Sequence, residues 1–362
     1  MNSDRTATRS PLIIPVFIPH AGCPHHCVFC DQRKITATQP PLPTDRDIHD
    51  RIRAFLDTRR PDRRTAEVSF YGGNFLGLPP SSIHRLLTAA ARWVDDGRID
   101  GIRFSTRPDT VTPKRLEAID RYPVRTVEIG VQSMNDAVLA SSGRGHSARD
   151  ALEAVQRSKA RGRSVGVQLM IGLPGDDDDS AMSTTRQVVD MAPDFVRIYP
   201  TLVLSGSGLA EDFATGVYRP LALNEAVSLA SRMYLEFVSN GIRVIRMGLQ
   251  PTDELSLPGT VLAGPYHPSF GELVHQSCFL ELAQWLLQNA AIPGRPVEEP
   301  VLRVHPRSES KLRGPGNRNL RKLEEKSGCK AIRIHIDPSI GPLALALGDG
   351  SAVPLTTPGG TS

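Results

Sequence analysis

The stretch PLIIPVFIPHAGCPHHCVFC, from Pro11 to Cys30, joins an apolar segment typical of a buried strand to three of the chain's five cysteines. Cys23, Cys27 and Cys30 follow that segment with the spacing C-x3-C-x2-C. Further β-branched, apolar segments recur along the chain, with helical patterns between them. This alternation predicts parallel β-α units, and hence an α/β fold whose strands form an open or closed parallel β/α barrel. In such folds the chemistry collects in loops at the C-terminal ends of the strands, which is where the cysteines lie.

Two units are expected. The predicted strands of the barrel are 11–19, 66–73, 101–108, 124–132, 164–175, 194–204 and 242–248, and its predicted helices are 43–60, 80–96, 147–161, 180–191 and 223–240. After a helix at 270–290, a small α+β module is predicted from strands 300–306, 330–337 and 343–348 and helix 316–328. The predicted organisation is a disordered tail over 1–10, the barrel over 11–270, the module over 271–348 and a disordered tail over 349–362.

Composition narrows the class of protein. With 362 residues and 40% hydrophobic content, the chain can bury a large core, and it has no long uncharged apolar run that would cross a membrane. The start of the chain loosely imitates a lipoprotein cleavage site, but two prolines in the apolar run and His20 weaken that interpretation. Five cysteines, mostly clustered, do not form a disulfide framework, so a cytoplasmic location is expected.

The three clustered thiolates can bind zinc or an iron–sulfur cluster. A structural zinc ion needs four ligands and would have to recruit His25, His26, Cys278 or Cys329. A four-iron cluster held by three cysteines keeps one iron open for a second cofactor. Spacing alone favours the cluster and leaves zinc open.

Five ordered motifs at the ends of predicted strands resemble the radical S-adenosylmethionine (SAM) superfamily: the cysteine motif with Phe29 before the last cysteine, FYGGNFLGLP, STRPD, VEIGVQSMNDAVLASSGRGH and QLMIGLPG. Together they are most similar to the barrels of the elongator catalytic subunit and oxygen-independent coproporphyrinogen oxidase. The resemblance implies a four-iron, four-sulfur (4Fe-4S) cluster on Cys23, Cys27 and Cys30, with SAM on the fourth iron. It also implies an external one-electron reductant of the flavodoxin or ferredoxin type, and a 5′-deoxyadenosyl radical that abstracts hydrogen from the substrate.

The same resemblance implies which residues contact SAM, while the catalytic residues toward the substrate stay unknown. The implied contacts are Phe29, Gly72, Gly73, Asn74, Ser105, Gln132, Arg144 and Gln168. Asn74, Ser105 and Gln168 depart from the residues usual in these relatives, which makes a porphyrinogen a poor substrate candidate. The acidic run Asp176–Asp179 is expected to open a helix, where negative charge suits the helix dipole, with a divalent metal site as the alternative.

The C-terminal part suggests a partner. Between Arg303 and Lys330 there are nine lysines and arginines against three acidic residues, although the whole chain carries only +4. We expect a phosphate grip for RNA or tRNA around Lys311, Arg313, Arg318 and Arg321, with a solvated helix face as the alternative. The chain leaves too little room after the barrel for the acetyltransferase domain of the elongator branch. Two other functions stay open: a radical SAM reaction on a small metabolite, and a zinc-stabilised RNA-binding protein without enzymatic activity.

A segment rich in glycine and proline, residues 247–274, lies between the barrel and the module. It contains Tyr266 and His267 flanked by prolines. We expect a loop that covers the mouth of the barrel and contacts substrate, or else a purely structural cap.

Overall fold

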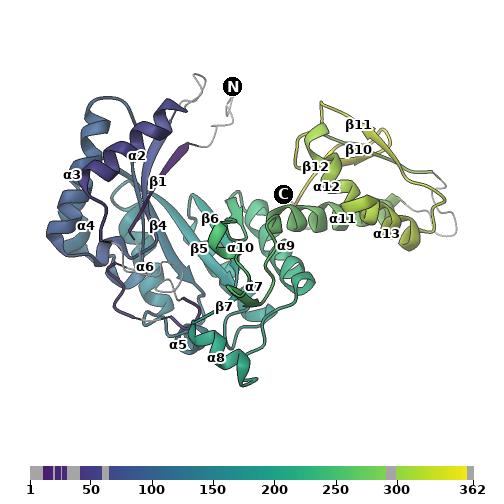
Figure 1. Cartoon of the computed structure of the whole chain (residues 1–362). Coiled ribbons are helices and arrows are strands. Elements are labelled where there is room, and N and C mark those ends of the chain that lie inside the picture. The colour runs from purple at the N-terminus through teal and green to yellow at the C-terminus, as the bar shows by residue number, and fades with distance from the viewer. Residues whose placement is uncertain are drawn as a thin grey trace.

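The computed structural model describes residues 11–18, 21–25, 27–30, 41–58, 65–290 and 299–356 (Figure 1). Its centre is a curved sheet of seven strands, all parallel, in the order β1-β2-β3-β4-β5-β6-β8. The strands are β1 (Leu12–Phe17), β2 (Ala66–Tyr71), β3 (Gly101–Thr106), β4 (Val124–Gln132), β5 (Ser164–Ile171), β6 (Phe195–Pro200) and β8 (Arg243–Met247). The prediction of a partial parallel β/α barrel is confirmed.

Helices cover the outer face of this sheet. They are α2 (Asp45–Asp57), α3 (Pro80–Asp95), α4 (Pro113–Ile119), α5 (Asp136–Ser141), α6 (Ala148–Lys159), α7 (Asp178–Met191) and α9 (Leu223–Ser239). Their starts follow local chemistry: Thr44 and Ser147 form capping boxes before α2 and α6, and Pro80 occupies the first turn of α3.

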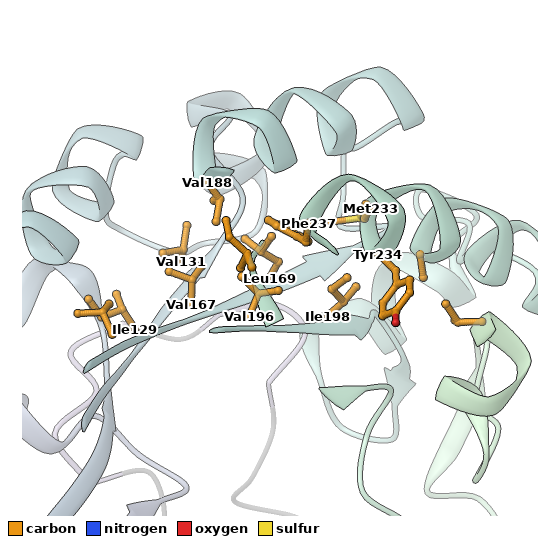
Figure 2. Packing of buried hydrophobic residues seen from close by; sticks show 14 of the residues in the cluster. Ile129, Val131, Val167, Leu169, Val188, Val196, Ile198, Met233, Tyr234 and Phe237 are labelled. Carbon is orange, nitrogen blue, oxygen red and sulfur yellow. The ribbon is translucent and has the colours of Figure 1, made fainter. Parts of the chain in front are cut away.

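The main core lies between the sheet and the helices. Alternate side chains of a strand point to opposite faces, so one set from β4, β5 and β6 meets the helices. Figure 2 shows Val131, Leu169 and Ile198 of this set beneath Val188 of α7 and Phe237 of α9. The other set, which points away from the helices, lines the inner face of the barrel.

Four short elements between β6 and the module form a cap beside the cysteines. They are β7 (Val203–Leu204), α8 (Gly208–Ala214), α10 (Asp253–Ser256) and β9 (Val261–Ala263), and β7 pairs with β9 in a two-stranded antiparallel ribbon. The predicted strand 194–204 therefore ends earlier, and its last residues leave the main sheet. Tyr266 packs against Leu202 and Leu204. His267 accepts a hydrogen bond from the N–H of Ser269 at the start of the next helix. Both side chains are partly exposed, so a contact of this loop with substrate stays a prediction.

A long helix, α11 (Phe270–Ala290), packs on α9 and runs to the C-terminal module (Figure 1). The module contains a four-stranded sheet in the order β11-β10-β12-β13. Its elements are β10 (Val301–Val304), α12 (Glu309–Arg313), α13 (Arg318–Ser327), β11 (Arg333–Ile336), β12 (Ala344–Leu347) and β13 (Val353–Pro354). The expected tail at 349–362 is wrong for residues 349–356, because β13 pairs with β12 and Leu355 is buried. The predicted N-terminal tail lies outside the described residues.

The described residues also contain short 3-10 turns at Phe75–Gly77, Pro108–Thr110, Pro306–Ser308 and Pro315–Asn317. Over the described ranges, none of the helices combines the length and the apolar composition that a membrane span requires.

Candidate functional site

The loop that carries the cysteines follows β1 and is held by backbone hydrogen bonds from three other parts of the fold. The N–H of Asn74, after β2, donates to the carbonyl of Ala21 at 3.0 Å. The N–H of Val28 donates to Ser142 at 3.1 Å, and the N–H of Leu209 donates to Val28 at 2.9 Å. The loop is therefore tied to the C-terminal ends of the strands and to the cap.

The predicted cluster ligands lie together on this loop with unequal exposure. Cys27 is buried, Cys30 is half-buried and Cys23 is exposed. Among the described side chains, no three from cysteine, histidine, aspartate or glutamate converge tightly enough to form a ready site for a metal ion. The remote Cys278 and Cys329 are both buried in the apolar core, and burial raises the pKa of Cys278 to about 12.

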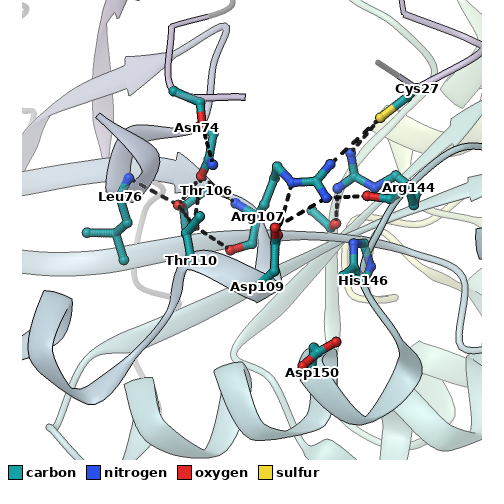
Figure 3. Close-up of polar contacts among 12 residues, drawn as sticks. Cys27, Asn74, Leu76, Thr106, Arg107, Asp109, Thr110, Arg144, His146 and Asp150 are labelled. Atoms are coloured by element: carbon teal, nitrogen blue, oxygen red, sulfur yellow. Dashed lines mark hydrogen bonds and ion pairs between the residues drawn. The ribbon is translucent and has the colours of Figure 1, made fainter. Parts of the chain in front are cut away.

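Two buried arginines approach the sulfur of Cys27 (Figure 3). Arg144 donates from Nη1 to Cys27 Sγ at 3.3 Å and from Nη2 to the carbonyl of Gly130 at 2.5 Å. Arg107 donates from Nη1 to the same sulfur at 3.8 Å, and its Nη2 donates to the carbonyl of Arg144. Arg144 was predicted as a site residue and Arg107 was missed, although it stands inside the STRPD motif at the end of the third strand.

Asn74 connects the loops after three strands. Its Oδ1 accepts from Thr106 Oγ1 at 2.7 Å, Thr110 Oγ1 at 2.8 Å and the N–H of Arg107 at 3.0 Å, and its Nδ2 donates to the carbonyl of Gly22 at 2.8 Å (Figure 3). The side chain is fully buried. The side chain therefore holds the loops of the site together, and the expected contact of Asn74 with SAM stays a prediction.

The paired glycines have a structural reason of their own. Gly72 has a φ of +88°, which favours glycine. A Cβ on Gly73 would lie 2.5 Å from the carbonyl oxygen of Ile18 and 2.8 Å from that of Ala21. Both glycines therefore let the end of β2 approach the cysteine loop. This structural role is additional to the expected close approach of SAM to the same backbone.

Gln132, Gln168 and Ser105 lie along the inner face. Gln132 is buried with a φ of +70°, unusual for a residue with a side chain, and β4 is irregular between Gly130 and Gln132. The amide of Gln168 donates to Gln132 Oε1 at 3.2 Å. Ser105 on β3 is the register partner of Glu128 on β4, so it shares this face. A strained backbone conformation such as that of Gln132, which lies beside Arg144, is typical of a functional site.

Phe29, the remaining predicted residue, has an apolar environment. It packs, partly buried, against the cluster of Val203, Leu209 and Tyr218 from the cap. This contact anchors the cysteine loop on the cap.

His146, which is buried beside the two arginines, is neutral. Burial, followed by the charges of Arg144 and Arg107, lowers the pKa of His146 to about 3. Its neutral ring donates from Nε2 to the carbonyl of Val131 at 3.1 Å. Desolvation also raises the pKa of the Cys23 thiol, against the opposite effect of Arg107.

A network of buried charges crosses the inner face of the barrel. Arg103 pairs with Glu67 at 2.7 Å and with Glu128 at 2.9 Å, and Arg197 pairs with Glu128 at 3.1 Å. The hydroxyl of Tyr71 donates to Glu128 at 2.8 Å. The sequence-based predictions missed this network, although polar residues at alternate positions of apolar strands could have indicated it.

The acidic run is a helix start, as predicted. Asp177 is the N-cap of α7 and accepts from the N–H of Ser180 at 2.8 Å. Asp178 pairs with Arg232 on α9. Asp176 differs from the others, because burial raises its pKa to about 6.

The site fits an anionic cluster. Three thiolates on an iron–sulfur core carry net negative charge, and the two guanidinium groups at Cys27 supply the compensating positive charge. The Nε of Arg144 is buried without a hydrogen-bond partner among the described residues, a donor that the protein itself does not satisfy. The charges and donors around Cys27 fit such a cluster, and its ligation by Cys23, Cys27 and Cys30 stays a prediction.

Comparisons with known proteins agree with this chemistry. The model of the radical SAM superfamily matches residues 17–188, and that of the radical SAM C-terminal domain matches residues 193–278. An uncharacterized protein of Methanocaldococcus jannaschii is 25% identical over 250 residues, which cover 67% of this chain and 76% of that protein. A tRNA uridine(34) acetyltransferase of the same organism is 31% identical over 177 residues, 48% of this chain but 31% of the relative.

The solved structure of the elongator protein Elp3 from Methanocaldococcus infernus, with an N-terminal deletion, has a TM-score of 0.59 and 23% identity over 74% of this chain and 62% of that one. The chain thus spans about a third of the acetyltransferase and under two thirds of the Elp3 structure. The matched families use a 4Fe-4S cluster and SAM, which removes the alternative of a zinc-stabilised binding protein. The chain is an enzyme of the radical SAM superfamily.

Proposed function

We propose that Cys23, Cys27 and Cys30 hold the 4Fe-4S cluster and that SAM binds beside it, at the C-terminal ends of β4 and β5. When bound, the two cofactors supply a 5′-deoxyadenosyl radical that abstracts hydrogen from a substrate. The chain's own residues hold the ligand loop, supply positive charge and exclude water. Arg144, with its planar fork, is the proposed partner of the SAM carboxylate, and Gln132 and Gln168 are proposed neighbours of SAM.

We propose RNA, with tRNA first, as the substrate class. The observation that carries this proposal is the similarity to a tRNA uridine(34) acetyltransferase, combined with the basic C-terminal module. The relative is matched over only part of its length, so its activity as a whole is not transferred. An external one-electron reductant and a cytoplasmic location complete the proposal; the clustered cysteines favour the latter.

The basic surface of the module centres on α13. Of the four predicted contacts, Arg318 and Arg321 are exposed on this helix, with Lys322 beside them. Arg313 is paired with Glu309 at 2.7 Å, and Lys311 donates to the carbonyl of Arg307 at 3.3 Å. The grip is therefore assigned mainly to the exposed face of α13 and less to Lys311 and Arg313.

A matched pair of variants tests this grip. Arg318→Ala combined with Arg321→Ala should weaken tRNA binding and flatten its salt dependence by about 0.7 per lost single-strand contact. Arg46→Ala combined with Arg53→Ala on α2 removes two equally charged, exposed side chains from another surface and should change neither quantity. Equal effects of both double variants would show non-specific attraction to total charge.

The substrate class is tested by anaerobic incubation with SAM and a reductant, with and without total tRNA, followed by mass spectrometry of nucleosides. A tRNA nucleoside whose mass changes only in the complete reaction supports the proposal. An unmodified tRNA pool, together with SAM cleavage stimulated by a small-molecule extract, would favour a small metabolite as the substrate. The polar inner face around Glu128 and Arg197 could bind such a molecule.

A further inference from the structure

Arg107 occupies a central position between the loops of the site. It follows β3 and is 3% exposed. Its Nε pairs with Asp109 at 2.9 Å, its Nη1 approaches Cys27 Sγ at 3.8 Å, and its Nη2 donates to the carbonyl of Arg144 (Figure 3). Its own N–H donates to Asn74 at 3.0 Å. Each of the three nitrogens of the guanidinium group thus contacts a protein group, and these contacts fix its orientation.

Two guanidinium groups contact the sulfur of Cys27 directly, at 3.3 Å from Arg144 and 3.8 Å from Arg107. Donors and cations near the sulfurs of a cluster stabilise its reduced form, because reduction adds negative charge. Asp109 pairs with Nε, on the side of the guanidinium group away from the sulfur contact, so it orients Arg107 and offsets part of its charge.

We propose that Arg107 is a positioning residue that raises the reduction potential of the cluster through Cys27 and at the same time holds the backbone of Arg144 in place. The proposal rests on the proposed ligation by Cys23, Cys27 and Cys30. The two arginines then have different roles: Arg144 contacts Cys27 and is the proposed partner of SAM, whereas Arg107 contacts Cys27 and the Arg144 backbone.

The test compares Arg107→Gln, Arg107→Lys and the control Arg115→Gln after anaerobic reconstitution. Arg115 is a matched control because its guanidinium group also donates to a backbone carbonyl, that of Leu78, at 3.0 Å. No hydrogen bond joins it to a cysteine among the described residues. The readouts are iron and sulfide content and the reduction potential followed by electron paramagnetic resonance in the absence of SAM. These readouts do not require turnover.

In Arg107→Gln, iron content should be kept and the potential should fall. At a poise equal to the wild-type midpoint, the reduced fraction should drop about tenfold or more, as expected for removing a cation within a few ångströms of a charged group. Arg107→Lys and Arg115→Gln should stay near wild type.

An unchanged potential in an iron-loaded Arg107→Gln variant, or loss of iron from both Arg107 variants, would overturn the proposal and leave Arg107 with a purely structural role. A wild-type protein that forms no 4Fe-4S cluster, or keeps it in Cys27→Ala, would instead overturn the proposed ligand set. The two failures are therefore distinguishable.

Discussion

Replacing Glu128 tests the charged network on the inner face. The carboxylate is 4% exposed and accepts from Arg103, Arg197 and the hydroxyl of Tyr71. Glu128→Ala would leave buried positive charge without its partner, which typically costs about 3–5 kcal/mol. Glu128→Gln keeps the shape and an acceptor, and Arg103 retains Glu67, so we expect a loss of about 2 kcal/mol.

The assay is urea unfolding at neutral pH, comparing midpoints at equal m-values. Glu153→Gln is the matched control, because Glu153 pairs with Arg149 and Arg157 but lies on the surface of α6, where such pairs contribute under about 1 kcal/mol. If Glu128→Gln cost no more than this control, the network would be a surface-like arrangement and its assignment to a buried inner face would be refuted.

Three further outcomes are expected. In urea unfolding, Gly73→Ala should cost more than about 1 kcal/mol of stability, because its Cβ would lie 2.5 Å from a backbone oxygen. The control Gly341→Ala, which has open space around it, should cost little. Burial raises the pKa of Asp176 from 3.8 to about 6, so its favourable contribution to the free energy of unfolding is full below pH 3.8 and is lost as the pH rises through 6. Asp176→Asn should therefore flatten the dependence of stability on pH over this range, and an unchanged dependence would contradict the pKa shift. Arg144→Lys should keep the cluster but weaken SAM binding by about 1–3 kcal/mol in calorimetry. Equal SAM affinity in this variant would contradict the proposed contact between Arg144 and SAM and leave only its contact with Cys27.

The barrel was predictable because its signals are local. Each predicted barrel strand coincides with a strand of the sheet, since continuous apolar runs between capped helices leave few other structures. The end of the chain was not predictable in this way. β13 has two residues, and only its pairing with β12 and the burial of Leu355 reveal that it is ordered.

The ligand loop was predictable because three cysteines in nine residues are a local pattern. The surroundings were not, because they depend on contacts between distant segments. Asn74 has the polarity of a ligand contact, but its oxygen also accepts hydrogen bonds from the end of β3 and the loop after it. Arg107 gains its significance from Cys27, which lies 80 positions earlier in the sequence.

The most direct measurement is the formation of 5′-deoxyadenosine from SAM by anaerobically reconstituted protein with a low-potential reductant. We predict 5′-deoxyadenosine and methionine in equal amounts, with none from Cys23→Ala, Cys27→Ala or Cys30→Ala and wild-type amounts from Cys278→Ala. Intact SAM in the presence of a fully loaded, reduced cluster, or undiminished cleavage by a variant of the cysteine loop, would contradict the proposed chemistry.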